Sequence, residues 1–211
     1  MPLVRPGPGG AAPPGRNTGI PAPTPAAPAS RLRRPPRPPN PRGAPAPAAD
    51  ELRRLLAAAA RVPDHGKLEP WRFVVLEPRA LARLAHLARE RAIAEGHDDA
   101  GIAKAAQQFE QSPLAVAVIE VQKPSDKIPG LEMTYSAGAA ALSLLNAALA
   151  AGWGANWLTG WLAHDGPFAE AALGLAENER IAGFIHIGTE SAAPPERPRP
   201  DLDGIVTWLS E

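Results

Sequence analysis

The sequence predicts an α+β domain in which helices cover a sheet, and three observations support this prediction. Several segments carry apolar residues at helical spacing, and others are short apolar runs rich in β-branched residues. The two kinds of segment alternate irregularly, unlike the regular repeat of a parallel α/β fold, and no internal repeat is visible. The chain has 211 residues, which is enough for one domain and a tail.

The predicted domain begins with an amphipathic helix. Asp50 is expected to cap it, and Arg61 is expected in its last turn, where a cation is favoured. Pro63 and Gly66 should end it. Its apolar face is predicted to contain Leu52, Leu55, Leu56 and Ala59.

The remaining elements follow from apolar runs and their flanking residues. Strands are expected at residues 71–76, 114–121, 181–188 and 205–209, and helices from Pro78, around residues 102–111, over residues 135–151 and between Asp165 and Gly174. Residues 122–134 are predicted to form a loop. The helix over residues 135–151 is apolar nearly all round, so we expect it in the core or in the interface of a homodimer.

Residues 1–48 differ in composition from residues 49–211, the predicted folded domain. Sixteen of the 27 prolines lie in the first 50 residues. Few apolar side chains are available there to offset the entropy of ordering, so disorder is expected. Two other interpretations are a Pro-rich ligand for an aromatic groove and an arm for anionic surfaces. A GC-rich gene read out of frame gives the same composition, so a frame or start error before about Gly43 is a further hypothesis.

Composition also limits the function. The chain has no cysteine, which excludes disulfides and thiolate chemistry and fits a reducing cytoplasm. Residues 1–50 carry a charge of +6 and the remainder carries −6. The acidic balance of the folded part argues against a nucleic-acid partner. No apolar run is long enough to predict a membrane span, and no secretory signal is visible.

Motifs of hydrolases and metal sites are absent from the sequence. It has no G-x-S-x-G, H-E-x-x-H or P-loop motif, and its five histidines lack the spacing of zinc ligands. Gly152 and Gly154 follow a helix and not a strand, which is the wrong context for a dinucleotide-binding turn. His186 lies inside an apolar strand, where a core histidine with satisfied hydrogen bonds is expected.

Two segments stand out as candidate binding loops. Residues 61–73 place basic groups and His65 in the turn between a helix and a strand, which would suit an anionic ligand. The alternative is that Arg61 caps the helix and Asp64 stabilises a turn. Residues 152–161 hold three tryptophans and three glycines, and the indoles could wall a flat heteroaromatic ligand. The alternative is a well-packed core turn.

These segments resemble the single-domain NAD(P)H nitroreductase family over roughly three quarters of the chain. The matching positions are Arg61, Pro63, Asp64, His65, Pro70, Trp71 and Phe73 in a stretch written R-x-P-D-H-x-x-x-x-P-W-x-F, then Ser136-Ala137-Gly138, then Gly152, Gly154, Trp157, Thr159 and Gly160. The strand at residues 181–188 and the proline-rich residues 195–200 also fit.

The resemblance implies an FMN-binding fold with a mostly antiparallel sheet covered by helices, in an obligate homodimer that shares each flavin between subunits. Arg61 and His65 are then expected to approach FMN from one subunit, and Trp157, Leu158 and Thr159 from the other. NAD(P)H would reduce the flavin, which would reduce nitroaromatic or quinone-like acceptors in a ping-pong order. The cofactor carries the hydride chemistry, so no catalytic side chain is expected.

The sequence departs from the family at the phosphate anchor. Family members carry Arg-Arg-Ser near the start of the domain, whereas this chain has Arg33-Arg34-Pro35. Proline lacks both the N–H and the hydroxyl that would bind phosphate. The alternative function is therefore a non-catalytic flavin-fold protein that has lost its anchor. A Pro-rich adaptor is a third hypothesis.

Overall fold

Four antiparallel strands form the centre of the domain. In spatial order they are β1 (Trp71–Leu76), β2 (Ala115–Val121), β4 (Glu179–Gly188) and β3 (Gly154–Leu158). Every neighbouring pair is antiparallel, with one bulge between Val118 and Ile119 where β2 meets β4. The α+β class and the antiparallel sheet expected from the sequence are confirmed.

The structure is a computed structural model that describes residues 45–190 and 198–210. The expectations for the Pro-rich segment, including disorder and a frame error, fall on residues 1–44 almost entirely and so lie outside the described residues. All described residues belong to one unit, residues 32–211. The predicted start of the folded domain, residue 49, is the first residue of the helix α1. The division of the chain at this residue stays a prediction.

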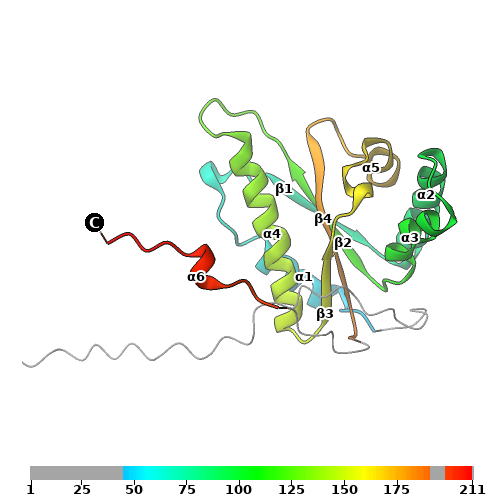
Figure 1. Ribbon diagram of the computed structural model, residues 1–211, viewed down its shortest axis with the longest axis horizontal. Helices are drawn as coiled ribbons and strands as arrows, with labels where there is room; N and C mark the ends of the chain where they lie inside the picture. Colours follow the sequence, from blue (N-terminus) through cyan, green and yellow to red (C-terminus); the bar gives the residue numbers. More distant parts are fainter. Residues whose placement is uncertain (1–44, 191–197, 211) are drawn as a thin grey trace, which may run out of the picture. The chain divides into compact units, whose positions relative to one another are not determined.

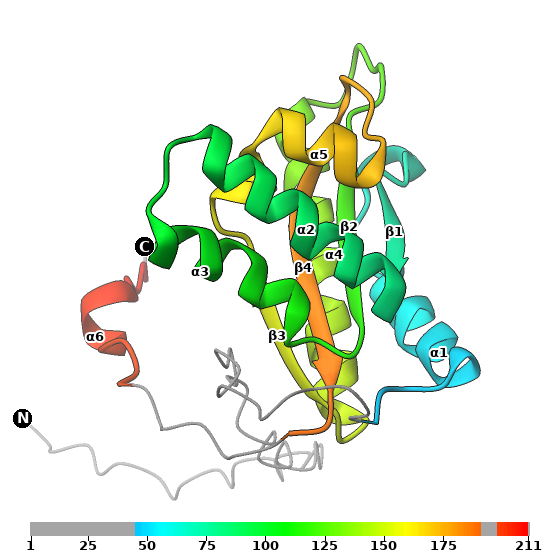
Figure 2. The same ribbon diagram turned by 90° about the vertical axis from the view of Figure 1, so that its right-hand side faces the viewer.

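Helices cover both faces of the sheet (Figures 1 and 2). One face carries α1 (Ala49–Ala59) and α4 (Gly130–Ala150), and the other carries α2 (Pro78–Ala94), α3 (Asp99–Glu110) and α5 (Gly166–Leu173). Side chains alternate along a strand, so Val116 and Val118 face α4 while Ala117 and Ile119 face the other layer. β2 is therefore buried on both sides, as its apolar sequence predicts.

Several element boundaries differ from those expected. Ala48 and not Asp50 is the N-cap of α1, because Asp50 already lies in the first turn. Arg61 lies beyond the end of α1, whose C-cap is Ala60. α4 begins at Gly130, five residues before the predicted start, and Pro129 occupies its N-cap.

Its full length of 21 residues makes α4 long and apolar enough to cross a membrane, judged by length and composition alone. The sequence had indicated a shorter segment that could not span. In the structure, α4 packs against α1 and the sheet, as core helices of globular domains do.

Two predictions about strands are wrong. Residues 152–161 were predicted to form a turn, but Gly154–Leu158 forms the edge strand β3. The glycines and tryptophans of this segment do not indicate a strand from the sequence, because β3 depends on its pairing with β4. Conversely, the strand predicted at residues 205–209 is absent, and α6 (Leu202–Ile205) stands at its start. Apolar and β-branched residues favour a strand only where a partner strand is available. Two short 3-10 helices, η1 (His65–Lys67) and η2 (Trp161–His164), complete the described elements.

The indole of Trp157 lies across β4, where a glycine makes room for it. The indole Nε1–H donates to the carbonyl oxygen of Ala182 at 3.3 Å. A Cβ atom added to Gly183 would lie 1.9 Å from that nitrogen, well inside contact distance. The packing of Trp157 against the sheet therefore requires the missing side chain at position 183.

His186 and Asn156 are cross-strand partners on β4 and β3, and both are buried. Among residues 45–190 and 198–210, neither imidazole nitrogen of His186 has a hydrogen-bond partner, nor does the Asn156 amide nitrogen. The rings of Phe109 and Phe184 lie beside His186, each with its centroid 6.5 Å away. Burial lowers the pKa of His186 from 6.5 to about 4, because the apolar surroundings penalise the charged form. The prediction that His186 lies in the core is confirmed, but the prediction that its nitrogens are hydrogen-bonded is wrong within the described residues.

Replacing Gly183 with alanine should destabilise the fold, because the indole of Trp157 cannot stay in place beside a methyl group. We expect a loss of roughly 1–3 kcal/mol in the free energy of unfolding, typical of overpacking. Urea denaturation followed by circular dichroism measures it. Gly152→Ala is a less suitable control, because Gly152 has a positive φ of 88°. Gly138→Ala is suitable, because its added Cβ would meet nothing within 4 Å. Equal stability of the Gly183→Ala and wild-type proteins would contradict the described packing.

His186 should make the fold sensitive to acid. Its folded pKa lies below its unfolded value, so stability is fully present above pH 6.5 and is lost as the pH falls toward about 4. The total loss is about 3 kcal/mol at about 1.4 kcal/mol per pH unit. His186→Leu should remove this component, so its unfolding free energy should depend less on pH between pH 6.5 and about 4.

Some carboxyl groups also contribute to the pH dependence of the unfolding free energy. The contribution of His186 is therefore obtained from the difference between the variant and wild type. Hydrogen bonds from Arg91 hold the pKa of Asp165 below its usual value, so its contribution is lost at still lower pH. His164→Leu, at an exposed position, is the matched control and should keep the wild-type slope. If His186→Leu and wild type lose stability in parallel, His186 does not titrate as described.

Candidate functional site

The turn between α1 and β1 carries His65 and contains residues in the left-handed conformation directly after it. Asp64 stabilises it, since its two carboxylate oxygens accept from the backbone N–H groups of Leu68 at 3.2 Å and Glu69 at 2.7 Å. Three residues have positive φ: Gly66 at 70°, Lys67 at 55° and Glu69 at 49°. A left-handed conformation costs a residue other than glycine roughly 1–3 kcal/mol, and such strain concentrates at functional sites. The Asp64 turn expected from the sequence is therefore present.

The first turns of α4 fix this turn in place. The Ser136 hydroxyl donates to the carbonyl oxygen of Pro63 at 2.7 Å and accepts the indole N–H of Trp71 at 3.1 Å. One turn earlier on the same helix face, the Glu132 carboxylate lies 2.6 Å from Nδ1 of His65. Ser136 thus joins α4 to both ends of the segment that leads from Pro63 into β1.

A buried carboxylate anchors the beginning of α4 to the sheet. Glu120 on β2 accepts from the Thr134 hydroxyl at 2.8 Å, from Arg180 at 2.6 Å and from the side chain of Gln122. Burial acts to raise the pKa of Glu120, but these three hydrogen bonds outweigh it and hold the pKa below its usual value. The helix that contacts His65 is therefore fixed at its first turns.

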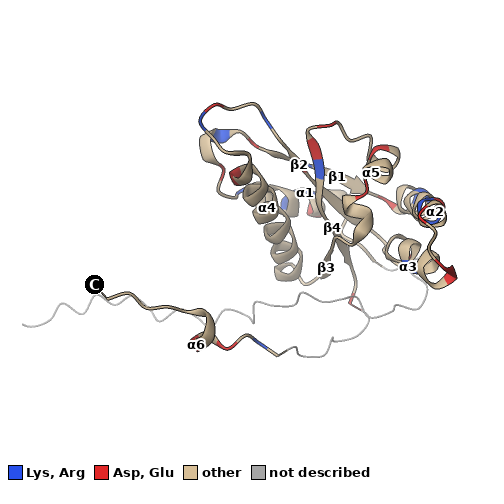
Figure 3. Ribbon diagram, turned by 45° about the horizontal axis from the view of Figure 1, so that its top comes forward, with Lys and Arg blue, Asp and Glu red and all other residues tan. Residues whose placement is uncertain are grey.

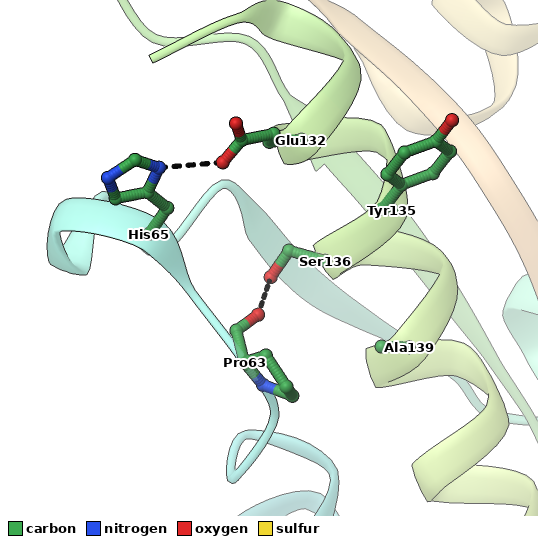
Figure 4. Close-up of a pocket in the computed structure, with 6 residues that line it drawn as sticks. All are labelled: Pro63, His65, Glu132, Tyr135, Ser136 and Ala139. Atoms are coloured by element: carbon green, nitrogen blue, oxygen red, sulfur yellow. Dashed lines mark hydrogen bonds and ion pairs between the residues drawn. The ribbon is translucent and has the colours of Figure 1, made fainter. Parts of the chain in front are cut away.

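A cavity of about 330 Å³ lies between the turn and α4 (Figure 4). Its wall is mainly apolar, and its polar groups come from the turn and from α4. The residues that line it are Pro63, His65, Glu132, Tyr135, Ser136 and Ala139. This cavity is the candidate site, because it combines an apolar wall with a histidine held in a strained turn.

Arg61 and His65, both predicted site residues, lie on the same turn as expected. Arg61 is exposed, and its guanidinium has no partner among the residues that the structure describes. Its backbone N–H, and not its side chain, contacts the end of α1 through the carbonyl oxygen of Ala58. The interpretation of Arg61 as a side-chain helix cap is therefore not supported. The His65 side chain is 61% exposed, and among the described residues its only hydrogen-bond partner is Glu132, at Nδ1.

Trp157, Leu158 and Thr159, the other predicted site residues, lie at the end of β3. The Trp157 indole packs on the sheet face that α4 covers, and Leu158 points to the opposite face. Thr159 follows the strand and is half-buried, and its hydroxyl has no partner within the described part of the chain. Gly160 then turns the chain with φ 63° and ψ −178°, a conformation open essentially only to glycine.

The three tryptophans of this segment do not form one wall. Trp153 donates its indole N–H to Glu51 at 2.8 Å, and Trp157 lies across Gly183. Trp161 stacks on His97, with ring centroids 5.0 Å apart. The three indoles therefore pack at separate places and do not line one shared site.

The two groups of predicted site residues lie at opposite edges of the sheet. His65 precedes β1 and Thr159 follows β3, and three strand spacings of roughly 4.8 Å separate these edges. They are also offset along the strands, because Trp71 is in register with Glu120 beside Arg180 whereas Leu158 pairs with Phe184. A single chain therefore does not bring the two groups together.

Glu132 was not among the predicted site residues. The sequence placed it in a loop, so its position one helical turn before Ser136 was hidden. The i, i+4 spacing of the two residues would have indicated a shared face if the helix had been predicted to begin at Gly130. No cluster of three metal-ligating side chains occurs among residues 45–190 and 198–210.

Comparisons with known proteins identify similar sequences and folds. The sequence profile of the nitroreductase family matches residues 42–189. The Escherichia coli (strain K12) protein YdjA, whose name proposes an NAD(P)H nitroreductase, is 36% identical over 166 residues, which are 78% of this chain and 90% of YdjA. A Haemophilus influenzae protein whose name proposes the same activity is 35% identical over 169 residues, covering 79% of this chain and 91% of its own length.

Solved structures show the same fold. A nitroreductase-like family protein from Bacillus cereus superposes with a TM-score of 0.67 at 24% identity, covering 85% of this chain and 93% of its own. An FMN-bound nitroreductase from Bacteroides fragilis gives 0.61 at 21% identity, with coverage of 78% and 89%. The profile match spans more than half of the chain, and the relatives align over most of their length. The chain therefore belongs to the nitroreductase family.

Proposed function

We propose that this protein is an FMN-dependent oxidoreductase that uses NAD(P)H to reduce nitroaromatic or quinone-like acceptors. Its curated relatives carry names that propose NAD(P)H nitroreductase activity. Among structures of the same fold, one contains FMN and another is described as an FMN- and NADPH-dependent nitroreductase. The observation that carries the proposal is the cavity beside His65, with Arg61 on the same strained turn, in a chain of this family.

The described residues fit the ring system of a flavin. The cavity wall is mainly apolar, as a planar heteroaromatic ring requires. The guanidinium of Arg61 and Nε2 of His65 have no partner among the described residues, so both are available to an anionic or polar edge. Bound FMN would supply the hydride chemistry, and the protein would supply position and charge.

The two groups of predicted site residues lie at opposite edges of the sheet, and this supports the proposal of a homodimer. Within one chain these two groups are too far apart to contact the same flavin. In a dimer, Arg61 and His65 of one subunit could share a flavin with residues 157–159 of the other. α4 carries exposed apolar side chains at helical spacing, namely Leu131, Tyr135 and Leu142. Glu132 is the only charged residue of this helix, and in Figure 3 the ribbon of α4 is tan over nearly its whole length. A second copy would cover this face.

The remaining parts of the proposal concern turnover and location. NAD(P)H and the acceptor would occupy the cavity one after the other, which gives the ping-pong order. The excess of acidic residues after residue 50 argues against nucleic acid as a partner, and the absence of cysteine fits the cytoplasm. We propose that the protein does not act at a membrane.

One observation favours a second candidate, a flavin-fold protein without catalytic activity. Pro35 stands where the family has the serine of its phosphate anchor, and residues 33–35 lie outside the described residues. Without that anchor, the phosphate of FMN would lose its charge-assisted contacts, and the affinity for FMN would fall.

Titration of apo-protein with FMN tests the function and the residues. We expect a yellow purified protein, and a dissociation constant for FMN that rises about ten- to a hundredfold in Arg61→Ala, because a charge-assisted contact is lost. His65→Ala should also weaken FMN binding, with little change in thermal stability.

Arg79→Ala and His164→Ala remove exposed side chains elsewhere and are the matched controls. They should bind FMN as wild type does. A wild-type protein that stays colourless with added FMN would favour the second candidate, and unchanged affinity in Arg61→Ala and His65→Ala would remove both residues from the site.

If the exposed face of α4 forms the interface of a homodimer, a charged residue introduced on that face should separate the subunits. Leu142→Glu introduces a carboxylate at a position that is 44% exposed, so the chain should still fold. We expect a dimer for wild type and a monomer for this variant at micromolar concentration, measured by light scattering. Ile93→Glu, on exposed surface of α2, is the control and should stay dimeric. A monomeric wild type would refute the shared site.

A further inference from the structure

We infer that Glu132 is the positioning residue of His65, and that it determines which imidazole nitrogen faces the cavity as a hydrogen-bond acceptor. This inference rests on the proposed function, because it assigns His65 a role toward the bound flavin. Glu132 itself is not proposed to contact the cofactor.

The contact is short and comes from a fixed element. The Glu132 carboxylate lies 2.6 Å from Nδ1 of His65, and both side chains line the cavity (Figure 4). Glu132 stands on the first turns of α4, which Thr134 anchors to the buried Glu120. On the other side, Ser136 holds the carbonyl oxygen of Pro63, two residues before His65. The carboxylate and the imidazole are therefore both held by structure outside the pair.

A carboxylate can only accept a hydrogen bond, so Nδ1 must carry the proton. In neutral His65 this leaves Nε2 without a proton, and Nε2 can accept a hydrogen bond from a ligand. In the charged form both nitrogens are protonated, and the negative charge of Glu132 balances the imidazolium. Glu132 thus orients the ring and selects the tautomer, as second partners do for metal-binding histidines.

The pair contributes little to the stability of the fold. Both side chains are largely exposed, at 61% for His65 and 42% for Glu132. Exposed ion pairs are typically worth 0–1 kcal/mol, roughly, because water screens the charges. An effect of Glu132 on ligand binding can therefore be measured without loss of the fold.

The tautomer can be read in the apo-protein by nitrogen NMR of the histidine rings, with the His65 signals assigned by their loss in His65→Ala. In the alkaline range where imidazole is neutral, we expect wild type to show a protonated Nδ1 and an unprotonated Nε2. Glu132→Ala should lose this preference. Glu132→Gln should keep it, because the amide oxygen still accepts from Nδ1. The same tautomer in wild type and in Glu132→Ala would overturn the inference.

FMN titration tests the consequence for the site. Glu132→Ala should raise the dissociation constant about tenfold, and Glu132→Gln by a smaller factor, because the amide keeps the orientation but not the charge. In a His65→Ala background, Glu132→Ala should have almost no further effect, since it acts through His65. Glu77→Ala removes an exposed carboxylate outside the turn, one that makes no capping hydrogen bond to α2, and should bind FMN as wild type does.

The outcomes separate this inference from the proposed function. If wild type binds no FMN, the proposed function fails, while an altered tautomer in Glu132→Ala would still support the positioning of His65. If FMN binds but Glu132→Ala weakens it equally with and without His65, then Glu132 acts independently and the inference is wrong. Unchanged affinity in Glu132→Ala would also overturn it.

Discussion

The close packing of α4 against the sheet is the constraint on which the rest of the structure depends. Small side chains on its buried face, among them Ala137, Ala140 and Ala141, bring the helix near the strands. That distance lets Ser136 reach both Pro63 and Trp71, and it lets Glu132 reach His65. The strained turn is therefore supported by a helix whose position is itself set by packing. Larger residues on this face would move the helix away from the turn and weaken all of these contacts.

The sequence predicts elements well where burial alone determines them. The strand β2 and the helix α2 follow from their apolar patterns and from Pro78. The elements that the sequence missed or misplaced depend on partners far along the chain. β3 exists because β4 pairs with it, and the segment after α6 has no strand to pair with. The early start of α4 depends on contacts of its first turns with β2, which local propensity does not report.

The candidate site was predictable in part. Motifs indicated the turn with Arg61 and His65, because its residue types and order are distinctive. The sequence alone could not show that this turn and the end of β3 lie at opposite edges, since that depends on strand order. It also could not show that the Trp157 indole packs on the sheet, or that Glu132 contacts His65. These are consequences of tertiary structure that no local pattern contains.

The indole of Trp157 also fixes how β3 aligns with its neighbour. An edge strand rich in small residues can slip along its partner, and a shift by one residue would turn every side chain to the opposite face. Gly183 leaves room for the indole on β4, whereas its neighbours Ala182 and Phe184 carry side chains. The tryptophan and the glycine therefore act as a matched pair that selects a single alignment as the chain folds. Thr159, which follows directly, then always reaches the same place at the edge of the sheet.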